Sequence, residues 1–405
     1  LLFIYRIIKF TLYHFYLIDK IFKNMKNQKI CIIGDGLAGL TTALVLKNLD
    51  LDIDLFYKKK SFKVKEDTRT TAISPSNYQF IKKELNIKNT SHFLGCKKIE
   101  LFYEKEKRII NFLNLSEKDK SLMYIFKNHK FRDILITKIK KEKKIKFINS
   151  KSIDLNSEGS FIKHNGKKFF YDLIILCTGK NSNFYEEINI KRSITRDYKE
   201  IAITGPVTHN LNITNPKQFF LKEGPLAILP TKRNEFSFVW SVDKKFYNNN
   251  LSILELKIKK KFKEIMKLDL RSKLKKINSF PLQLNLKTNY FRRNILVLGE
   301  GIHTIHPIAG QGFNLVIRDI IKLNNLIKKN NTLGMQIKDS FLLKNFYQVR
   351  KPENLLFGLG VDFTNSFFKD RKIFNPLKDL FLENIKKSES VRRLAKKVSD
   401  TGIFV

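Results

Sequence analysis

The 405-residue sequence predicts an α/β fold: a parallel sheet with flanking helices, a β-rich insertion, and a helical C-terminal part. Two observations predict the parallel sheet. The apolar segments KICIIG (residues 29–34) and NILVLG (residues 294–299) each run into a glycine-rich turn and then a helical pattern. A third observation predicts the insertion, because residues 191–245 are rich in strand-like segments, whereas residues 335–405 are mostly helical.

The first glycine-rich turn has the spacing of a dinucleotide-binding βαβ unit. Gly34, Gly36 and Gly39 follow the apolar strand, a helical pattern comes next, and residues 52–57 (DIDLFY) form the second strand. Gly34 permits the tight turn, Gly36 lets a pyrophosphate approach the backbone, and Gly39 lets the helix pack close to the strand. The N–H groups and positive dipole end of the helix then face the phosphates.

An acid usually binds the adenosine ribose about 20 residues after these glycines, and here it is missing. The second strand ends in Tyr57 and Lys58. Asp54 lies nearby, but strand alternation directs its side chain to the face opposite Tyr57. We therefore expect the ribose contact to be made by other groups or to be weaker.

Other elements follow from the periodicity of apolar residues. The pattern predicts a β-hairpin within residues 97–113. It also predicts a strand and then a helix from His129 within residues 121–145. A buried strand is predicted within residues 167–177. Residues 252–275 predict a lysine-rich amphipathic helix.

The second glycine-rich turn is the most informative segment, residues 296–319 (LVLGEGIHTIHPIAGQGFNLVIRD). An apolar strand ends in Gly299 and Glu300, a loop with His306 and Pro307 follows, and residues 310–312 open a helix. A carboxylate there can accept hydrogen bonds from sugar or ribityl hydroxyls, and the helix start can receive an anionic ring edge. Two such junctions on one sheet fit an extended cofactor such as FAD.

This segment resembles the GD-type motif of FAD-dependent aromatic hydroxylases. It is most similar to that of the ubiquinone-biosynthesis hydroxylases, whose pattern is GDAAHxxHPxxGQGxNxGxxD. The positions that match are Gly299, His303, His306, Pro307, Gly310, Gln311, Gly312, Asn314 and Asp319. Weaker matches in the family order are the glycines at 34–39, Arg69, Ala72, Gly224, Pro225, Leu229, Pro230, Trp240, Tyr347 and Arg350. The resemblance spans about residues 28–405.

The resemblance implies a Rossmann-like FAD-binding domain with an inserted β-sheet substrate domain. It implies a monooxygenase that hydroxylates the aromatic ring of a polyprenylated phenol in ubiquinone biosynthesis. O2 and NAD(P)H or another reductant would be consumed, via a flavin C4a-hydroperoxide. The implied cofactor-binding residues are Gly34, Gly36, Leu37, Ala38, Gly39, Arg69, Asn128, Glu300, Pro307, Gly310, Gln311, Gly312, Phe313 and Asn314. No catalytic residue is assigned, although His306 and Pro307 are candidates to face the flavin.

Domain boundaries follow from the same comparison of motifs and composition. Residues 1–25 are predicted to be a non-native or disordered extension, with Met25 as the natural start. The predicted FAD-binding domain comprises residues 26–96, 121–182 and 281–334, the substrate domain residues 97–120 and 183–280, and the C-terminal helical region residues 335–405.

Several positions depart from the family pattern. Glu300 stands where the family has Asp, Gly301 where it has Ala, and Cys177-Thr178-Gly179 where it has Ala-Asp-Gly. The last motif is linked to FAD and nicotinamide contacts. Another FAD-dependent oxidoreductase, such as a small-phenol hydroxylase or a prenyl reductase, is an alternative function. The changed positions leave open a weak flavin binder or a degenerate enzyme. They also leave open a non-catalytic flavoprotein subunit of a quinone-synthesis complex.

Single residues have simpler interpretations too. Arg69 fits a surface ion pair, and Asn128 fits a helix N-cap. His303 and His306 fit a bracing role in their loop. Two further residues favour the core, because Trp240 is a large aromatic and Cys177 a small hydrophobe. The pair Gly224-Pro225 fits a turn.

The formal charge of +40 is the compositional anomaly. Arg supplies 15 of the 78 basic residues and Lys the other 63, whereas base and phosphate recognition favours Arg. We interpret the surplus as lysines on solvated surfaces, with attraction to anionic lipid as a secondary effect, and expect no nucleic-acid partner. Three cysteines without a CxxC pair favour a reducing, cytoplasmic setting and indicate no metal site. Peripheral association with the inner face of the membrane stays open as an alternative.

Overall fold

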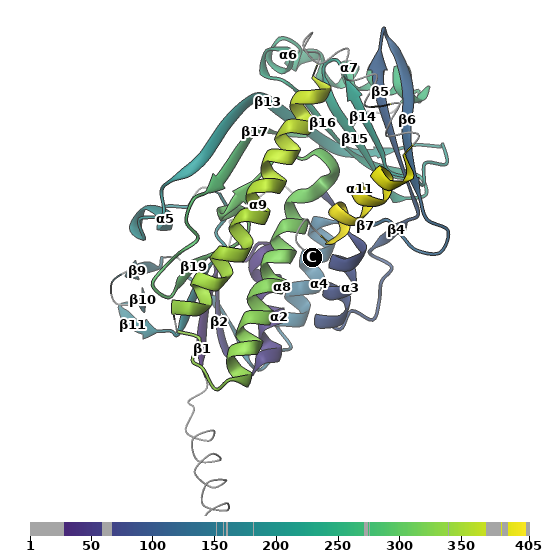
Figure 1. Ribbon diagram of the computed structural model, residues 1–405. Helices are drawn as coiled ribbons and strands as arrows, with labels where there is room; N and C mark the ends of the chain where they lie inside the picture. Colours follow the sequence, from purple (N-terminus) through teal and green to yellow (C-terminus); the bar gives the residue numbers. More distant parts are fainter. Residues whose placement is uncertain are drawn as a thin grey trace, which may run out of the picture.

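Two large sheets organise the chain, one mostly parallel and covered by helices, the other mostly antiparallel (Figure 1). The computed structural model describes residues 28–58, 67–150, 152–156, 158, 161–180, 182–270, 274, 276–338, 340–369, 382 and 388–401. The predicted extension at residues 1–25 lies outside these ranges.

The six-stranded sheet has the order β18-β19-β12-β1-β2-β8. All neighbouring pairs are parallel except β18 and β19. Its strands are β1 (Lys29–Ile33), β2 (Asp52–Tyr57), β8 (Ile145–Asn149), β12 (Leu173–Leu176), β18 (Phe291–Arg292) and β19 (Ile295–Val297). The predicted strands at residues 29–34, 52–57 and 294–299 are confirmed, and so is the buried strand expected within residues 167–177.

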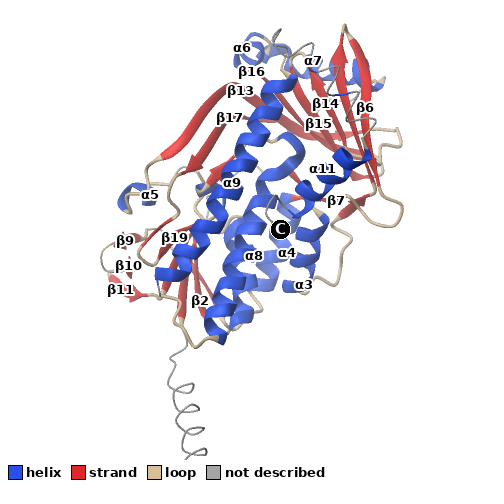
Figure 2. Ribbon diagram, viewed as in Figure 1, coloured by secondary structure: helices blue, strands red, loops and turns tan. Residues whose placement is uncertain are grey.

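Helices accompany this sheet, as Figure 2 shows. They are α2 (Leu37–Leu46), α3 (Pro75–Glu84), α4 (Asn128–Ile139), α8 (Gln311–Thr332) and α9 (Ser340–Phe368). Together with the sheet they enclose the largest apolar core, in which the four residues of β12 are fully buried. Strands buried on both faces read as continuous apolar runs, which is why they were visible in the sequence.

The eight-stranded sheet has the order β20-β17-β13-β16-β15-β14-β5-β6 and is antiparallel except for the pair β14 and β5. Its strands are β5 (Lys98–Lys105), β6 (Arg108–Ser116), β13 (Ser193–Thr208), β14 (Lys217–Leu221), β15 (Gly224–Lys232), β16 (Glu235–Asp243), β17 (Asn278–Lys287) and β20 (His303–Thr304). The predicted hairpin within residues 97–113 is β5 and β6. Trp240 lies in the core of this sheet at 1% exposure, as predicted.

Smaller elements complete the structure. One three-stranded sheet contains β3 (Thr70–Ile73), β4 (Leu94–Cys96) and β7 (Met123–Lys127), and the other contains β9 (Asp154–Asn156), β10 (Phe161–His164) and β11 (Lys167–Phe170). The other helices are α5 (Phe184–Glu187), α6 (Lys244–Asn249), α7 (Leu254–Met266) and α11 (Glu389–Thr401). Short 3-10 turns cover Lys47–Leu49, Leu251–Ile253, Gly299–Gly301 and Ile308–Gly310.

The predicted fold class, an α/β fold with a β-sheet insertion and C-terminal helices, is confirmed. The predicted helix at residues 252–275 is too long, because α7 ends at Met266, where Lys267 takes a left-handed conformation with φ of 53°. Gly224 begins strand β15 rather than forming only a turn. The predicted domain boundary at residue 281 falls inside strand β17.

No helix among the described residues has both the length and the hydrophobicity needed to span a membrane. Likewise, the described residues contain no group of three or more His, Cys, Asp or Glu side chains placed to hold a metal ion.

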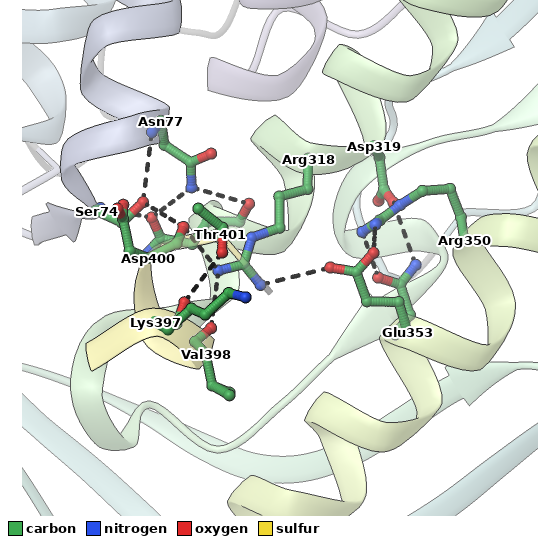
Figure 3. Close-up of polar contacts among 12 residues, drawn as sticks. Ser74, Asn77, Arg318, Asp319, Arg350, Glu353, Lys397, Val398, Asp400 and Thr401 are labelled. Carbon is green, nitrogen blue, oxygen red and sulfur yellow. Dashed lines mark hydrogen bonds and ion pairs between the residues drawn. The ribbon is translucent and has the colours of Figure 1, made fainter. Parts of the chain in front are cut away.

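A buried charge network joins α8 to α9, and Figure 3 shows its Asp319, Arg350 and Glu353 members. Asp319 is fully buried. Its carboxylate accepts a hydrogen bond from Nε of Arg350 at 2.6 Å and lies 2.7 Å from Nε2 of His303. Arg350 also pairs with Glu353 and donates to Asn354. The predicted bracing role of His303 is thus confirmed, since its ring ties the loop before α8 to that helix.

We predict that Asp319→Asn lowers the free energy of unfolding by about 3 kcal/mol at pH 7, because Arg350 loses one of its two buried carboxylate partners. Burial alone would raise the pKa of Asp319, but Arg350 and His303 outweigh it and lower that pKa. Its ionised form therefore stabilises the fold above about pH 4, the unfolded value, and this stabilisation disappears as the pH falls through the folded pKa.

Urea unfolding measured from pH 7 to pH 2 tests this prediction. The variant should show a shallower acid limb than the wild type. The control Asp50→Asn removes an exposed partner of Lys144 and should change stability by no more than about 0.5 kcal/mol. Parallel curves for wild type and Asp319→Asn would contradict the assignment.

Candidate active site

A cavity of about 510 Å³ lies where the carboxyl ends of β1, β12 and β19 meet the first turns of α2 and α8; we call it the glycine cavity. The predicted cofactor-binding residues that line it are Gly34, Gly36, Leu37, Ala38, Arg69, Asn128, Glu300, Pro307, Gly310, Gly312 and Phe313. The structure therefore brings together residues that lie more than 270 positions apart in the sequence.

Two glycines of the first turn, Gly34 and Gly39, have the structural roles predicted from their spacing. A Cβ on Gly34, whose φ is +120°, would lie 2.3 Å from the carbonyl oxygen of Cys177. A Cβ on Gly39 would lie 1.9 Å from the carbonyl oxygen of Gly34, so helix and strand pack backbone to backbone. A Cβ on Gly36 meets nothing within 4 Å, and this residue leaves bare backbone on the cavity wall.

Two helix N-termini point to this cavity. The N-cap residues of α2 and α8 are Gly36 and Gly310, which provide no side-chain cap, and neither first turn contains an acid. The first backbone N–H groups of a helix lack intrahelical partners and carry its positive dipole end. The two helix starts, with the bare backbone at Gly36 and Gly312, fit an extended group with a pyrophosphate at one end and an anionic ring at the other.

Charged side chains near the first turn are arranged in pairs. The carboxylate of Asp35, within the glycine turn, forms an ion pair with Arg132 of α4, which offsets its repulsion of a phosphate. Arg69 donates to Asp67 at 2.8 and 2.9 Å, and this hydrogen-bonded carboxylate raises the pKa of Arg69. The predicted ion pair of Arg69 is thus confirmed, and its side chain still lines the glycine cavity.

Asn128 is not the predicted N-cap of α4. The N-cap is Lys127, and Asn128 is the first helical residue. Its buried side chain accepts a hydrogen bond from the hydroxyl of Thr71 at 2.6 Å and lines the cavity. The prediction failed because the turn into α4 comes one residue earlier, where β7 ends.

Three of the predicted cofactor-binding residues lie outside the lining of the glycine cavity: Gly39, Gln311 and Asn314. Asn314 instead clamps the start of α8. It accepts from the backbone N–H of Ser74 and from Asn77, both at 2.8 Å, and donates to the carbonyls of Ala72 and Gly310. The clamp fixes the helix N-terminus against β3 and α3.

His306, a candidate to face the flavin, points elsewhere. Its ring is 1% exposed, with Nε2 lying 2.8 Å from a carboxylate oxygen of Glu200 on β13. Burial would raise the pKa of Glu200, but His306 and Lys369 outweigh it and lower that pKa. The bracing role predicted as an alternative for His306 is confirmed. Pro307, the other candidate, does line the cavity.

Among the described residues at the end of β2, neither Tyr57 nor Asp54 is free to replace the missing ribose acid. Tyr57 stacks on Phe147, with ring centroids 4.1 Å apart. Asp54 is buried and engaged by the hydroxyl of Tyr171 and by Lys29, both at 2.7 Å. As predicted, Asp54 cannot serve as the ribose ligand.

A second cavity, of about 580 Å³, adjoins the first, and we call it the apolar cavity. It lies between the start of α8 and the strands of the eight-stranded sheet. Its apolar lining includes Ile99, Leu101, Leu113, Leu115, Met123, Phe220, Ala227 and Leu229. The lining residues shared with the glycine cavity are Thr70, Val239, Pro307 and Gly310. The two cavities therefore adjoin at Pro307, next to the start of α8.

The last turns of α11 line part of the apolar cavity. Figure 3 shows the polar contacts around Asp400. The carboxylate of Asp400 accepts from the backbone N–H and the hydroxyl of Ser76 at 2.8 and 2.9 Å. Its carbonyl accepts from the hydroxyl of Ser74 and from Arg318 of α8. The end of α11 is thus attached to the N-terminus of α3 and to α8.

Sequence analysis missed several lining residues. Thr204, Val239 and Phe280 come from β13, β16 and β17, and Asp400 comes from the far end of the chain. Strand alternation places every second residue of those strands on one face, but it does not say which face meets α8. No sequence signal indicated α11 as part of the site.

Comparisons with known proteins agree with this geometry. The family model described as an FAD binding domain matches residues 164–331. The mitochondrial ubiquinone biosynthesis monooxygenase COQ6 of Dictyostelium discoideum is 26% identical over 341 residues, covering 66% of this chain and 68% of that protein. The ubiquinone hydroxylase UbiL of Rhodospirillum rubrum is 27% identical over 189 residues, covering 45% of this chain and 43% of that protein.

A solved structure shows the same fold. The p-nitrophenol 4-monooxygenase PnpA of Pseudomonas putida superposes with a TM-score of 0.74 at 13% identity, covering 93% of this chain and 99% of that one. The matched FAD-binding domain and the homologous monooxygenases together indicate an FAD-dependent monooxygenase, an oxidoreductase of the flavoprotein class. Within that class the chain is a homologue of the ubiquinone-biosynthesis hydroxylases, as the resemblance predicted.

We predict that Gly36→Ala weakens FAD binding at least tenfold, about 1.4 kcal/mol, because the new methyl group projects from the bare cavity wall. Gly36 has φ of −71°, which alanine adopts without strain, so the apoprotein should keep its melting temperature. Quenching of flavin fluorescence measures the affinity. Gly360→Ala, on an open face of α9, is the control with unchanged affinity. Equal affinities for both variants would contradict this placement of the pyrophosphate.

We predict that Asp400→Ala frees the end of α11 from α3, because two hydrogen bonds to Ser76 are lost. At about 1 kcal/mol each, their loss should speed local opening by roughly tenfold or more. Hydrogen-exchange mass spectrometry of the peptide at residues 389–401 measures this opening. Glu389→Ala removes an exposed pair with Arg393 and serves as the control. Unchanged protection in Asp400→Ala would show that other contacts hold the helix.

Proposed function

We propose that this protein is an FAD-dependent monooxygenase that hydroxylates the aromatic ring of a polyprenylated phenol in ubiquinone biosynthesis. One observation carries the proposal: a glycine-walled cavity with two helix N-termini adjoins an apolar cavity at Pro307 and Gly310. The first suits an extended anionic cofactor, and the second suits an apolar substrate whose reacting ring must meet that cofactor.

The residues proposed to hold FAD follow the cavity walls. The backbone at Gly34, Gly36, Leu37 and Ala38 would bind the pyrophosphate, and Arg69 and Asn128 would lie along the cofactor. Glu300 would accept hydrogen bonds from ribityl hydroxyls. Pro307, Gly310, Gly312 and Phe313 would face the isoalloxazine, supported from behind by Gln311 and Asn314, with Gly39 packing α2 on β1. We also propose the predicted division into an FAD-binding domain, a substrate domain and a C-terminal helical region, except for the boundary that falls inside β17.

When bound, FAD would supply the redox chemistry for inserting one oxygen atom of O2 into the ring. The protein contributes position and environment. The start of α8, clamped by Asn314, stabilises negative charge near Gly310 through its unpaired N–H groups. The apolar lining from β5, β6 and β15 orients the substrate and excludes water.

NAD(P)H is proposed as the electron donor, and a quinone-synthesis complex or a membrane surface as the physical context. A polyprenyl tail partitions into lipid, so the substrate is most readily taken from a membrane. Four of the residues that line the apolar cavity are lysines, which would attract anionic headgroups: Lys120, Lys217, Lys396 and Lys397. We propose a cytoplasmic protein that associates peripherally with the inner face of the membrane.

The direct test uses purified holoprotein with FAD, NADH or NADPH, and O2. A polyprenylphenol in detergent should stimulate O2 uptake, and mass spectrometry should find a product with one added oxygen atom. Stimulation by a water-soluble phenol alone would favour a small-phenol hydroxylase. Bound FAD without substrate-dependent O2 uptake would favour a non-catalytic flavoprotein subunit.

We predict that Ala227→Phe lowers kcat/KM for the polyprenylphenol at least tenfold while FAD affinity stays unchanged. The new ring would occupy the apolar cavity, and displaced apolar contacts of this size cost about 1–3 kcal/mol. Steady-state kinetics and flavin titration measure the two effects. Ile110→Phe adds aromatic bulk on the exposed part of β6 and should leave both values unchanged. A normal kcat/KM for Ala227→Phe would place the substrate elsewhere.

A further inference from the structure

Tyr185 lies behind the wall of the glycine cavity, where the sequence departs from the family pattern. It belongs to α5 and is 4% exposed. Its hydroxyl donates to the carbonyl oxygen of Gly179 and lies 3.2 Å from the hydroxyl of Thr178. Thr178 and Gly179 both line the cavity, directly after β12. One hydroxyl group therefore holds both residues of this segment.

Gly301 lies against the same hydroxyl. A Cβ on Gly301 would lie 2.3 Å from the hydroxyl oxygen of Tyr185 and 2.7 Å from a methyl group of Val297. The backbone of Gly301 does not have a positive φ, so the requirement for glycine here is one of space. Its neighbour Glu300 lines the glycine cavity. The hydroxyl of Tyr185 thus fills the space between the Thr178–Gly179 segment and the Glu300–Gly301 segment.

The ring of Tyr185 is also held from the side of the eight-stranded sheet. The ammonium group of Lys287, on β17, lies 5.2 Å from the ring centroid and donates to the carbonyl of Ile190 at 2.9 Å. Burial raises the pKa of Tyr185 to about 12, so its hydroxyl remains a neutral donor at physiological pH. The hydroxyl is therefore fixed in position and in protonation state.

We infer that Tyr185 is a positioning residue for FAD: its hydroxyl sets the spacing between the Thr178–Gly179 and Glu300–Gly301 segments of the cofactor wall. The departures at Thr178 and Gly301 then have one cause. Thr178 offers an uncharged partner to the hydroxyl, and Gly301 leaves room for it. The inference rests on the proposed placement of FAD in the glycine cavity, and hydroxylation of a phenol is not needed for it.

A double-mutant cycle tests this inference. Tyr185→Phe should weaken FAD binding about tenfold, the loss expected for one buried hydrogen-bonding hydroxyl. Gly301→Ala should weaken it at least as much, because its methyl group collides with the hydroxyl. In Tyr185→Phe/Gly301→Ala the closest clash is gone, so the double variant should bind FAD more tightly than the product of the two single effects predicts.

The readouts are the Kd for FAD from flavin fluorescence and the melting temperature of each apoprotein. Tyr347→Phe is the matched control, since that hydroxyl also donates to a backbone carbonyl, that of Thr288 at 2.7 Å. It should leave FAD affinity within twofold of the wild type. Thr178→Val gives a second route if Tyr185→Phe folds poorly, and it should weaken FAD binding while the apoprotein stays folded.

Unchanged FAD affinity in Tyr185→Phe and Thr178→Val would overturn the inference, and so would strictly multiplicative effects in the double variant. Both results are independent of the substrate. A wild-type protein that binds FAD but hydroxylates no polyprenylphenol would remove the proposed function and leave the role of Tyr185 intact. Normal hydroxylation of the polyprenylphenol, together with a double-mutant cycle that fails, would support the proposed function and remove the role of Tyr185.

Discussion

The site depends on a backbone-to-backbone contact between β1, α2 and the end of β12. No side chain fits at Gly34 or Gly39, where a Cβ would come within 2.3 Å of a backbone oxygen. Because these chains touch directly, the first turn of α2 lies at the carboxyl edge of the six-stranded sheet. Parallel sheets bind ligands at that edge, and the rest of the cavity is built against it.

The second helix start is brought to the same edge by polar contacts. Asn314 joins the beginning of α8 to Ala72 of β3 and to Ser74, the N-cap of α3. Further along α8, Asp319 and Arg350 fix that helix to α9. A helix end with unpaired N–H groups can serve as an anion site only if it is held still. The buried charges and amides of α8 therefore contribute to function through position.

The local parts of this site could be predicted from the sequence, and the distant parts could not. Gly34, Gly36 and Gly39 act within a few residues of one another, so their spacing alone indicates a βαβ turn. Val239 and Asp400 reach the cavities through long-range sheet pairing and helix docking, which leave no local pattern. His306 was misplaced as a candidate to face the flavin because its partner, Glu200, lies 106 residues away.

The large positive charge has a limited part in the site. Among the lining residues of the glycine cavity, Arg69 is the one basic side chain, and Asp67 already pairs with it. Four lysines line the apolar cavity, but Lys396 pairs with Glu117 and Lys217 with Glu100. This supports the proposal that cofactor binding relies on helix N-termini and backbone N–H groups, which are fixed in direction, rather than on mobile side-chain charge. Such oriented dipoles need little reorganisation when a ligand binds, because the fold already holds them in place.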